Sequence, residues 1–339
     1  MASAPPFSTQ PLTDSFGRRI TYLRISVTDR CDLRCRYCMS EAMTFMPRSQ
    51  ILSLEEIAHL ADAFVARGVR KIRLTGGEPL VRRGIPDLAR MIGRHIESGA
   101  LDELTLTSNG TNLEAHAEAL FAAGVRRINV SLDSRDPERF RFITRWGDVG
   151  KVLGGIAAAK AAGLKIKINM VALKGLNEDE IEPMLRWCAD EGHDLTLIET
   201  MPLGAIDEDR TDRYLPLDQV RRELGERLTL TPIPERTGGP ARYDRVEELG
   251  NRIGFITPLT NNFCEGCNRV RITASGRLYM CLGHDDRVDL RSALREGGPA
   301  ALDTALDEAM RLKPLRHNFE IEKRDAAPAV ERHMSVTGG

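Results

Sequence analysis

The sequence lacks both a charge excess and any long apolar run. Forty-eight Lys and Arg residues face 49 Asp and Glu residues, so the formal net charge is −1. With this balance no global field draws the chain to nucleic acid or an anionic membrane, and any bound anion needs local basic residues. The apolar runs are too short to span a bilayer, and residues 1–10 lack the charged-then-apolar pattern of a signal peptide. We therefore expect a cytoplasmic protein.

The cysteines also lack the even number that a disulfide framework needs. There are seven, arranged as two groups of three and a single Cys188. In a reducing cytosol, closely spaced groups of this kind indicate metal or redox chemistry more often than disulfides. Cys188 lies in an apolar helical stretch and is expected to be a buried small hydrophobe.

Strand-like and helix-like segments alternate over the first 200 residues. The expected strands cover residues 22–27, 71–75, 103–107, 127–132, 165–171 and 195–199. The expected helices cover 54–67, with Ser53 and Glu56 as a capping box and Gly68 as the stop, and 86–97, 114–122, 149–161 and 178–190. About six βα units predict an α/β fold with a parallel sheet, as a partial (βα)6 TIM-like barrel or, less favourably, an open doubly wound sheet.

Each expected strand has one apolar and one polar face, because side chains alternate with a period of two. The polar faces carry Arg24 and Ser26; Arg73 and Thr75; Thr105 and Thr107; Asn129 and Ser131; and Lys165, Lys167 and Asn169. Strands buried on both faces would instead be nearly all apolar. The polar faces therefore predict a wet, anion-binding lumen, although any one of these residues could lie at a strand end and face solvent.

The alternation ends after about Met201. A Pro- and Gly-rich stretch at 231–240 precedes the second cysteine group, and the last part of the chain reads as a loose tail. We place the barrel at residues 1–209. Residues 210–339 form a C-terminal segment that is expected to close the open side of the barrel.

The first cysteine group, Cys31, Cys35 and Cys38, directly follows the first expected strand. It therefore lies at the strand's carboxyl end, the face that carries active sites in barrel enzymes. Structural zinc needs four ligands, and no fourth Cys or His is near. Three thiolates on a four-iron cluster leave one iron open to a small molecule. The spacing favours such a cluster, with zinc or an inert loop as alternatives.

The second group is Cys264, Cys267 and Cys281, again without an obvious fourth ligand apart from His284. Its Cys-x-x-Cys alone is a weak signal, because zinc knuckles and redox pairs share it. Together with the first group it predicts a second cluster with an open iron. Arg269 and Arg271 follow on one face of an expected strand, and guanidinium groups bind phosphate in bidentate fashion.

A Gly-Gly-Glu-Pro segment, residues 76–79, ends the second expected strand. Paired glycines let the backbone approach a ligand closely. On the same face as the first cysteine group, this segment is a candidate edge of a cofactor site.

These motifs resemble those of the radical S-adenosylmethionine superfamily. The match to one family within it, the GTP 3′,8-cyclases of molybdenum-cofactor synthesis, extends over nearly the whole chain: Asp-Ser-Phe-Gly-Arg at 14–18, the run 23–31, Phe-Cys-Glu-Gly-Cys-Asn-Arg-Val-Arg at 263–271, and the final Gly338-Gly339. Asp32 and Ser40 depart from the family pattern, where Asn and Pro are common, but neither is a ligand position.

The resemblance implies roles for particular residues. The two cysteine groups would hold two [4Fe-4S] clusters. S-adenosylmethionine would bind the first cluster and residues Tyr37, Gly77, Ser131 and Met201. GTP would contact Arg24, Arg73, Thr107, Lys167, Arg269, Val270 and Arg271. Arg269, Arg271, Gly338 and Gly339 would serve catalysis, with the two terminal glycines threading into the cavity.

The implied reaction is a radical cyclisation by a lyase. A 5′-deoxyadenosyl radical would take the ribose 3′ hydrogen of GTP, and C3′ would bond to C8. The implied partners are GTP, an electron donor and a downstream enzyme that forms a cyclic pyranopterin, with the chain as a monomer or homodimer and no nucleic acid or membrane involved.

Two other functions stay open. A peptide-modifying radical enzyme with an auxiliary cluster is disfavoured by Arg269 and Arg271. An electron carrier or redox sensor is disfavoured because carriers normally complete each cluster with four cysteines.

Overall fold

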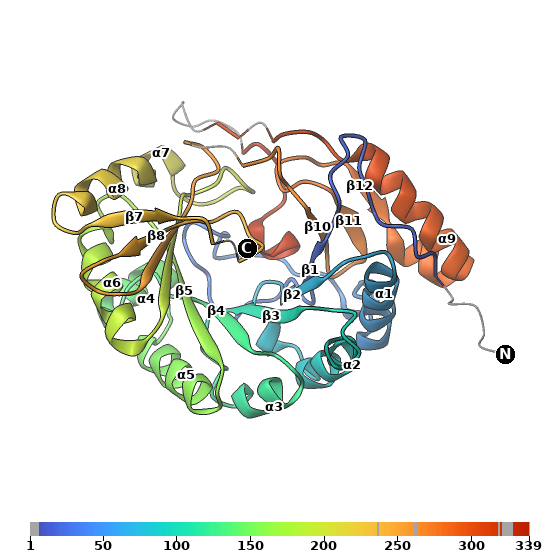
Figure 1. Ribbon diagram of the computed structural model, residues 1–339, viewed down its shortest axis with the longest axis horizontal. Coiled ribbons are helices and arrows are strands. Elements are labelled where there is room, and N and C mark those ends of the chain that lie inside the picture. Colours follow the sequence, from blue (N-terminus) through green and yellow to red (C-terminus); the bar gives the residue numbers. More distant parts are fainter. Residues whose placement is uncertain (1–6, 236, 261–262, 318, 321–327, 339) are drawn as a thin grey trace.

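One large, curved β-sheet organises the molecule (Figure 1). The computed structural model describes residues 7–235, 237–260, 263–317, 319–320 and 328–338. The strands are β1 (Tyr22–Ser26), β2 (Lys71–Thr75), β3 (Glu103–Ser108), β4 (Arg127–Ser131), β5 (Lys165–Val171), β6 (Asp194–Ile198), β7 (Leu230–Ile233), β8 (Arg242–Val246), β9 (Arg252–Ile256), β10 (Arg269–Ile272), β11 (Arg277–Tyr279) and β12 (Arg287–Asp289). Their order in the sheet is β12-β11-β10-β1-β2-β3-β4-β5-β6-β9-β8-β7.

The pairing shows how the C-terminal segment completes the barrel. From β10 through β1 to β6 and β9, neighbouring strands are parallel, and the outer pairs at both edges are antiparallel. The predicted partial barrel is confirmed, and the sheet stays open. The C-terminal residues add strands at both edges, which pairs backbone groups that a six-stranded parallel sheet would leave free.

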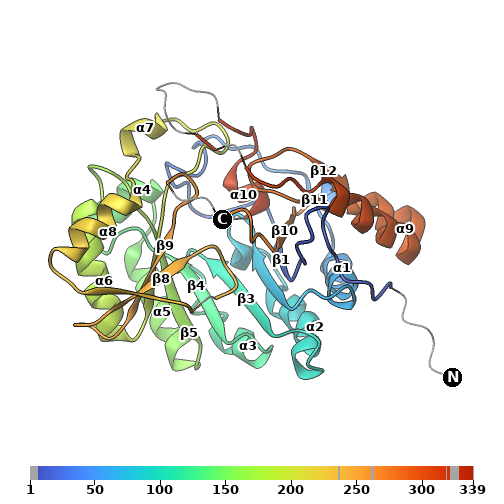
Figure 2. The ribbon, with the colours of Figure 1, turned by 45° about the horizontal axis from the view of Figure 1, so that its top comes forward.

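The helices lie mainly outside the sheet (Figures 1 and 2). They are α1 (Leu54–Ala66), α2 (Ile85–Glu97), α3 (Ala117–Ala122), α4 (Pro137–Thr144), α5 (Val149–Ala161), α6 (Ile181–Glu191), α7 (Arg210–Arg213), α8 (Leu217–Gly225), α9 (Leu290–Leu312) and α10 (Met334–Thr337), with 3₁₀ turns η1 (Arg48–Gln50), η2 (Pro79–Val81) and η3 (Glu178–Glu180). Within the described ranges, no helix is both long and apolar enough to cross a membrane.

Helix α1 illustrates how the local sequence sets these elements. The Ser53 hydroxyl accepts from the Glu56 backbone N–H and the Glu56 carboxylate accepts from the Ser53 N–H, so the expected capping box is present. The inner face of α1 buries Ile57, Leu60 and Phe64 completely. Each such side chain contributes about 1.5–3 kcal/mol by leaving water.

The six expected strands and most expected helices are confirmed, with small shifts at their ends. Helix α3 begins at Ala117 rather than 114, and α4 was not expected. The signal for α4 was present, because Asp136 accepts from the Arg139 N–H and Pro137 occupies the first turn.

The expectation of a loose tail is wrong for residues 328–338. Val330 forms a β-bridge with Leu203, and α10 packs against β1 on the concave side of the sheet (Figure 2). Ser335 and Thr337 are almost fully buried. Ser335 and Thr337 are polar, so the sequence of α10 gives no sign of burial. The helix is buried because it packs against the concave face of the curved sheet at β1.

Candidate active site

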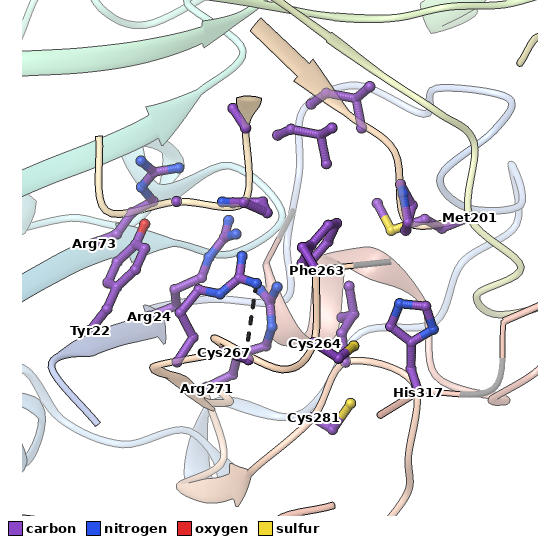
Figure 3. Close-up of a pocket in the computed structure, with 18 of the residues that line it drawn as sticks. Tyr22, Arg24, Arg73, Met201, Phe263, Cys264, Cys267, Arg271, Cys281 and His317 are labelled. Atoms are coloured by element: carbon purple, nitrogen blue, oxygen red, sulfur yellow. Dashed lines mark hydrogen bonds between the residues drawn. The ribbon is translucent and has the colours of Figure 1, made fainter. Parts of the chain in front are cut away.

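The concave side of the sheet encloses a cavity of about 120 Å³ (Figure 3). Five cationic side chains that were expected in the lumen line it: Arg24, Arg73, Lys167, Arg269 and Arg271. The three cysteines of the second group, Cys264, Cys267 and Cys281, form another part of the same wall. None of the described lining residues is an Asp or Glu. The cavity therefore joins a cationic region to a three-thiol region.

Strand register brings three of the arginines together. Arg24 of β1 is opposite Arg73 of β2 on one side and Arg271 of β10 on the other. Directly opposed like charges destabilise a sheet. The Nε and Nη2 atoms of Arg24 and the Nε of Arg73 are buried and have no hydrogen-bond partner within the described residues. Such a cluster needs an anion to satisfy it.

The cationic groups perturb one another's protonation. Burial and then the nearby Arg269 lower the pKa of Arg271 to about 10. Burial and then Arg271 hold the pKa of Arg24 well below its usual value, and burial followed by Arg73 does the same to the pKa of Lys167. A bound polyphosphate would offset this repulsion, because it supplies the missing negative charge.

The thiols of the second cysteine group differ in their electrostatics: burial raises the pKa of Cys264 and of Cys281, whereas that of Cys267 is lowered. Cys264 and Cys267 are tied by a turn in which the Cys267 N–H donates to the Cys264 carbonyl at 3.0 Å. Burial alone would raise the pKa of Cys267, but Arg269 and Lys313 outweigh it and lower that pKa to about 7. A thiol with this pKa is about half thiolate near neutral pH, and the thiolate is the form that binds iron.

The first cysteine group occupies the loop after β1, as expected. The Cys38 N–H donates to the Cys35 carbonyl at 2.9 Å, and the Leu33 N–H donates to the Cys31 sulfur at 3.4 Å. Burial raises the pKa of Cys38 to about 11. Burial, and then the nearby Asp133, Cys38 and Cys31, raise the pKa of Cys35.

Both groups fit a four-iron cluster. Among the described residues, no three His, Cys, Asp or Glu side chains converge as ligands of a single ion. A four-iron cluster does not need ligands that converge on one ion, because each cysteine thiolate binds a different iron and the three sulfurs surround the whole cluster. His284 binds the Arg316 carbonyl through Nε2 at 2.9 Å and does not line the cavity. Cys188 is fully buried, as expected.

The Gly-Gly-Glu-Pro segment clamps the first cysteine loop. The Gly77 N–H donates to the Thr28 carbonyl at 2.9 Å, and the Glu78 N–H donates to the Arg30 carbonyl at 2.8 Å. The buried Glu78 carboxylate accepts from the Ser108 hydroxyl at 2.9 Å. The sequence suggested that this segment forms one edge of a cofactor site. The structure adds a backbone hydrogen bond from Glu78 that positions Arg30, the residue before Cys31.

Gly77→Ala is expected to destabilise this clamp by about 1–3 kcal/mol. A Cβ at Gly77 would lie 2.4 Å from the Arg30 carbonyl oxygen, and this backbone atom cannot swing away. Urea unfolding of the cluster-free protein measures the change. Gly225→Ala is the matched control, because a Cβ there meets nothing within 4 Å. Equal stability of the two variants would contradict the clamp.

Other expected cofactor residues take several positions. Tyr37 donates its hydroxyl to the Asp133 carboxylate at 2.7 Å and lines a smaller neighbouring cavity. Burial raises the pKa of Asp133 to about 6. Met201 lines the main cavity, and Ser131 is paired in register with the cavity residue Asn169.

Several expected lumen or substrate residues do not line the cavity: Ser26, Thr75, Thr105, Thr107, Ser131, Lys165 and Val270. Thr107 accepts from Arg73 at 3.4 Å and supports the cationic cluster without lining the cavity. The Val270 side chain packs into the apolar core, because alternate residues of β10 point to opposite faces, so only its backbone can meet a ligand. The expectation of Lys165 in the lumen is wrong, since it starts β5 and is exposed.

The end of the chain reaches the cavity wall. The Gly338 carbonyl accepts from Nη1 of Arg271 at 2.9 Å. Its φ is +74°, and a Cβ would lie 2.1 Å from Cγ2 of Thr75, so only glycine fits. This position agrees with the expected threading of the tail. Gly339 lies outside the described residues.

Sequence reasoning missed several residues of the cavity. Tyr22, Phe263, His317 and Phe319 all line it, whereas Asn129, which also lines it, was expected in the lumen. The Tyr22 ring lies beside Arg73, whose guanidinium carbon is 5.7 Å from the ring centre. Tyr22 was detectable, because it lies two residues before Arg24 and is therefore in phase with an expected polar strand face.

The chain is similar to known proteins along its whole length. Residues 25–188 match the family model of the radical SAM superfamily, and residues 193–319 match that of molybdenum cofactor synthesis C. A GTP 3′,8-cyclase of Rhizobium etli is 62% identical over 330 residues, which cover 97% of this chain and 94% of that protein. The chain belongs to the GTP 3′,8-cyclase family. A family member from Erythrobacter litoralis is also 62% identical, over 97% of this chain and 98% of its own length.

Solved structures agree on the fold. Streptococcus suis SuiB bound to S-adenosylmethionine aligns with a TM-score of 0.64 at 14% identity, covering 91% of this chain and 69% of that one. SuiB bound to its precursor peptide SuiA gives a TM-score of 0.58 at 17% identity, covering 90% of this chain and 67% of that chain. At these identities the likeness concerns the partial barrel alone.

Proposed function

We propose that this chain is a lyase that converts GTP into (8S)-3′,8-cyclo-7,8-dihydroguanosine 5′-triphosphate, in molybdenum cofactor biosynthesis. The observation that carries the proposal is the shared wall of one cavity, with arginines and a lysine in one part and three cysteines in another (Figure 3). A nucleoside triphosphate has matching parts, a polyanion and a purine base. The high identity to GTP 3′,8-cyclases over the full chain supports the same assignment.

We assign the two cysteine groups to two [4Fe-4S] clusters. Cys31, Cys35 and Cys38 would hold the first, with S-adenosylmethionine beside Tyr37, Gly77, Ser131 and Met201; Cys264, Cys267 and Cys281 would hold the second. When bound, these groups would supply the 5′-deoxyadenosyl radical chemistry needed to abstract the ribose 3′ hydrogen and to close C3′ onto C8. The barrel would be residues 1–209 and its closing segment 210–339.

The chain's own residues bind, aim and enclose the substrate. Arg24, Arg73 and Lys167 hold the triphosphate by charge-assisted hydrogen bonds, which places the ribose at a fixed distance from the first cysteine loop. Arg269 and Arg271 line the wall between the cationic region and the second cysteine group. Gly338 lies against Arg271 at the cavity wall and helps to exclude water. Fixing the reacting atoms in this way lowers the entropic part of the barrier.

The remaining partners follow from this chemistry. Starting the reaction needs one electron from a donor outside the chain, and the product passes to an enzyme that forms a cyclic pyranopterin. We place the protein in the cytoplasm, where reducing conditions protect thiol-bound iron.

Arg24→Met is expected to weaken GTP binding by about 10- to 100-fold and guanosine binding far less. Arg24 is buried with two unpartnered guanidinium atoms, and each lost charge-assisted contact costs about 1.5–3 kcal/mol. Anaerobic calorimetry with GTP and guanosine measures both affinities. Arg70→Met is the control, because Arg70 is exposed and already paired with Asp102 outside the cavity. An equal loss for guanosine and GTP would show that Arg24 does not contact phosphate.

The activity itself is tested by mass spectrometry of anaerobic reactions. The reconstituted protein with S-adenosylmethionine, a reductant and GTP should give one 5′-deoxyadenosine for each cyclised nucleotide. Cofactor cleavage that does not depend on GTP, with no cyclised product, would overturn the proposal and favour another radical enzyme.

A further inference from the structure

Lys313 is a buried ammonium group beside the second cysteine group, at the C-cap of α9. The residue is 3% exposed. Its Nζ donates to the Met280 carbonyl at 2.7 Å and to the Arg269 carbonyl at 3.0 Å, and lies 3.7 Å from the Cys267 sulfur. No motif in the sequence pointed to it.

These three contacts span both segments that carry the cysteines. Met280 immediately precedes Cys281, and Arg269 follows Cys267 by two residues. The thirteen residues between Cys267 and Cys281 include the antiparallel strands β10 and β11. The two ends of this segment must lie close together if Cys267 and Cys281 are to bind the same cluster. One ammonium group holds both ends by hydrogen bonds, so it fixes their separation.

The segment that presents Lys313 is itself held by the N-terminal part of the chain. The Arg18 guanidinium donates to the carbonyls of Pro314 at 2.7 Å, Leu315 at 2.9 Å and Cys264 at 2.8 Å. Asp14 pairs with Arg18 at 2.6 Å, with both side chains nearly buried. Arg18 and Asp14 therefore hold Cys264 and the segment after Lys313 together, which gives the Asp-Ser-Phe-Gly-Arg segment a physical role.

We propose that Lys313 is a positioning residue for the second cluster, which orients Cys267 and stabilises the added negative charge when the cluster takes up an electron. This inference rests on the proposed two-cluster assignment. A fixed positive charge within hydrogen-bond range of a cluster sulfur favours the reduced state, because Coulomb attraction is strong where water is excluded. Groups of this kind that orient metal ligands typically change metal affinity by about 10- to 100-fold when lost.

Lys313→Met tests the proposal, because Met keeps most of the apolar stem and removes the charge and the three donors. It is made in a chain whose Cys31, Cys35 and Cys38 are Ala, so that the second cluster alone gives the electron paramagnetic resonance signal. The readouts are the reduction potential from a redox titration and the rate of iron loss to a chelator. Neither uses GTP or turnover, so they do not depend on the cyclase activity.

We expect a lower reduction potential and about 10- to 100-fold faster iron loss than in the parent. Lys71→Met is the matched control: Lys71 is also a buried lysine, but it contacts the Thr237 carbonyl and Glu103 rather than a cysteine. That control should leave the potential unchanged.

Lys313→Arg keeps the test decisive if the Met variant loads no cluster. Arginine retains the charge and donors, so it should restore iron loading and most of the potential. An unchanged potential with normal iron retention in Lys313→Met would overturn the proposal. Failure of both Lys313 variants to hold iron would also overturn it, because the charge and donors that arginine retains would then not be what the site requires.

Discussion

Replacing Cys264, Cys267 and Cys281 together with Ala is expected to eliminate the cyclised product, a loss of more than a hundredfold. The first cysteine group lies apart, on the loop after β1, and should keep its cluster and bound S-adenosylmethionine. GTP would lose its anchor at the three-thiol part of the cavity wall. A misplacement of about an ångström at the reacting atoms can cost on the order of a hundredfold in rate. The remaining activity is expected to be a slow release of 5′-deoxyadenosine that is not coupled to cyclisation.

The complementary variant changes Cys31, Cys35 and Cys38 to Ala. It should keep about four irons at the second site and still bind GTP, yet release no 5′-deoxyadenosine. Iron content, 5′-deoxyadenosine yield and product yield of both oxygen-free preparations decide between one site and two. Loss of all iron from either variant alone, or cyclisation by the first one, would show that the two groups are not independent sites.

Removing Gly338 and Gly339 is expected to abolish cyclisation while both clusters stay loaded. The Gly338 carbonyl accepts a hydrogen bond from Nη1 of Arg271. Helix α10, which precedes Gly338, packs against β1. Without the tail, one wall of the cavity opens to water and Arg271 loses the partner that fixes its guanidinium group. Product yield and iron content are measured on the same anaerobic sample.

Gly338→Ala is the finer version of this truncation. It keeps the chain length, but a Cβ would lie 2.1 Å from Thr75 at a φ of +74°, so the tail must leave its position. It should therefore behave like the truncated enzyme. Full turnover by either variant would mean that the tail has no part in the reaction.

The sequence by itself determined the six parallel strands of the barrel, most of the helices between them and the chemistry of the two cysteine groups. Strands β2 and β5 were predicted to the residue, because a period of two along a short segment is a local property. Both cysteine groups were recognisable for the same reason, since the ligands within each are close in the chain. Arg24, Arg73 and Lys167 were assigned to a lumen from the strand faces alone, and the structure places them there.

Only the tertiary structure decided which of these parts meet. The alignment of Arg24 with Arg271 depends on pairing between strands about 250 residues apart, and the position of Lys313 depends on where α9 ends against the second cysteine group. Gly338 reads as part of a loose tail until the curved sheet supplies the wall that it packs against. Local periodicity records which face a side chain takes. It does not record which distant segment pairs with a strand edge, because that is set by the backbone groups and buried surface that the whole fold must satisfy.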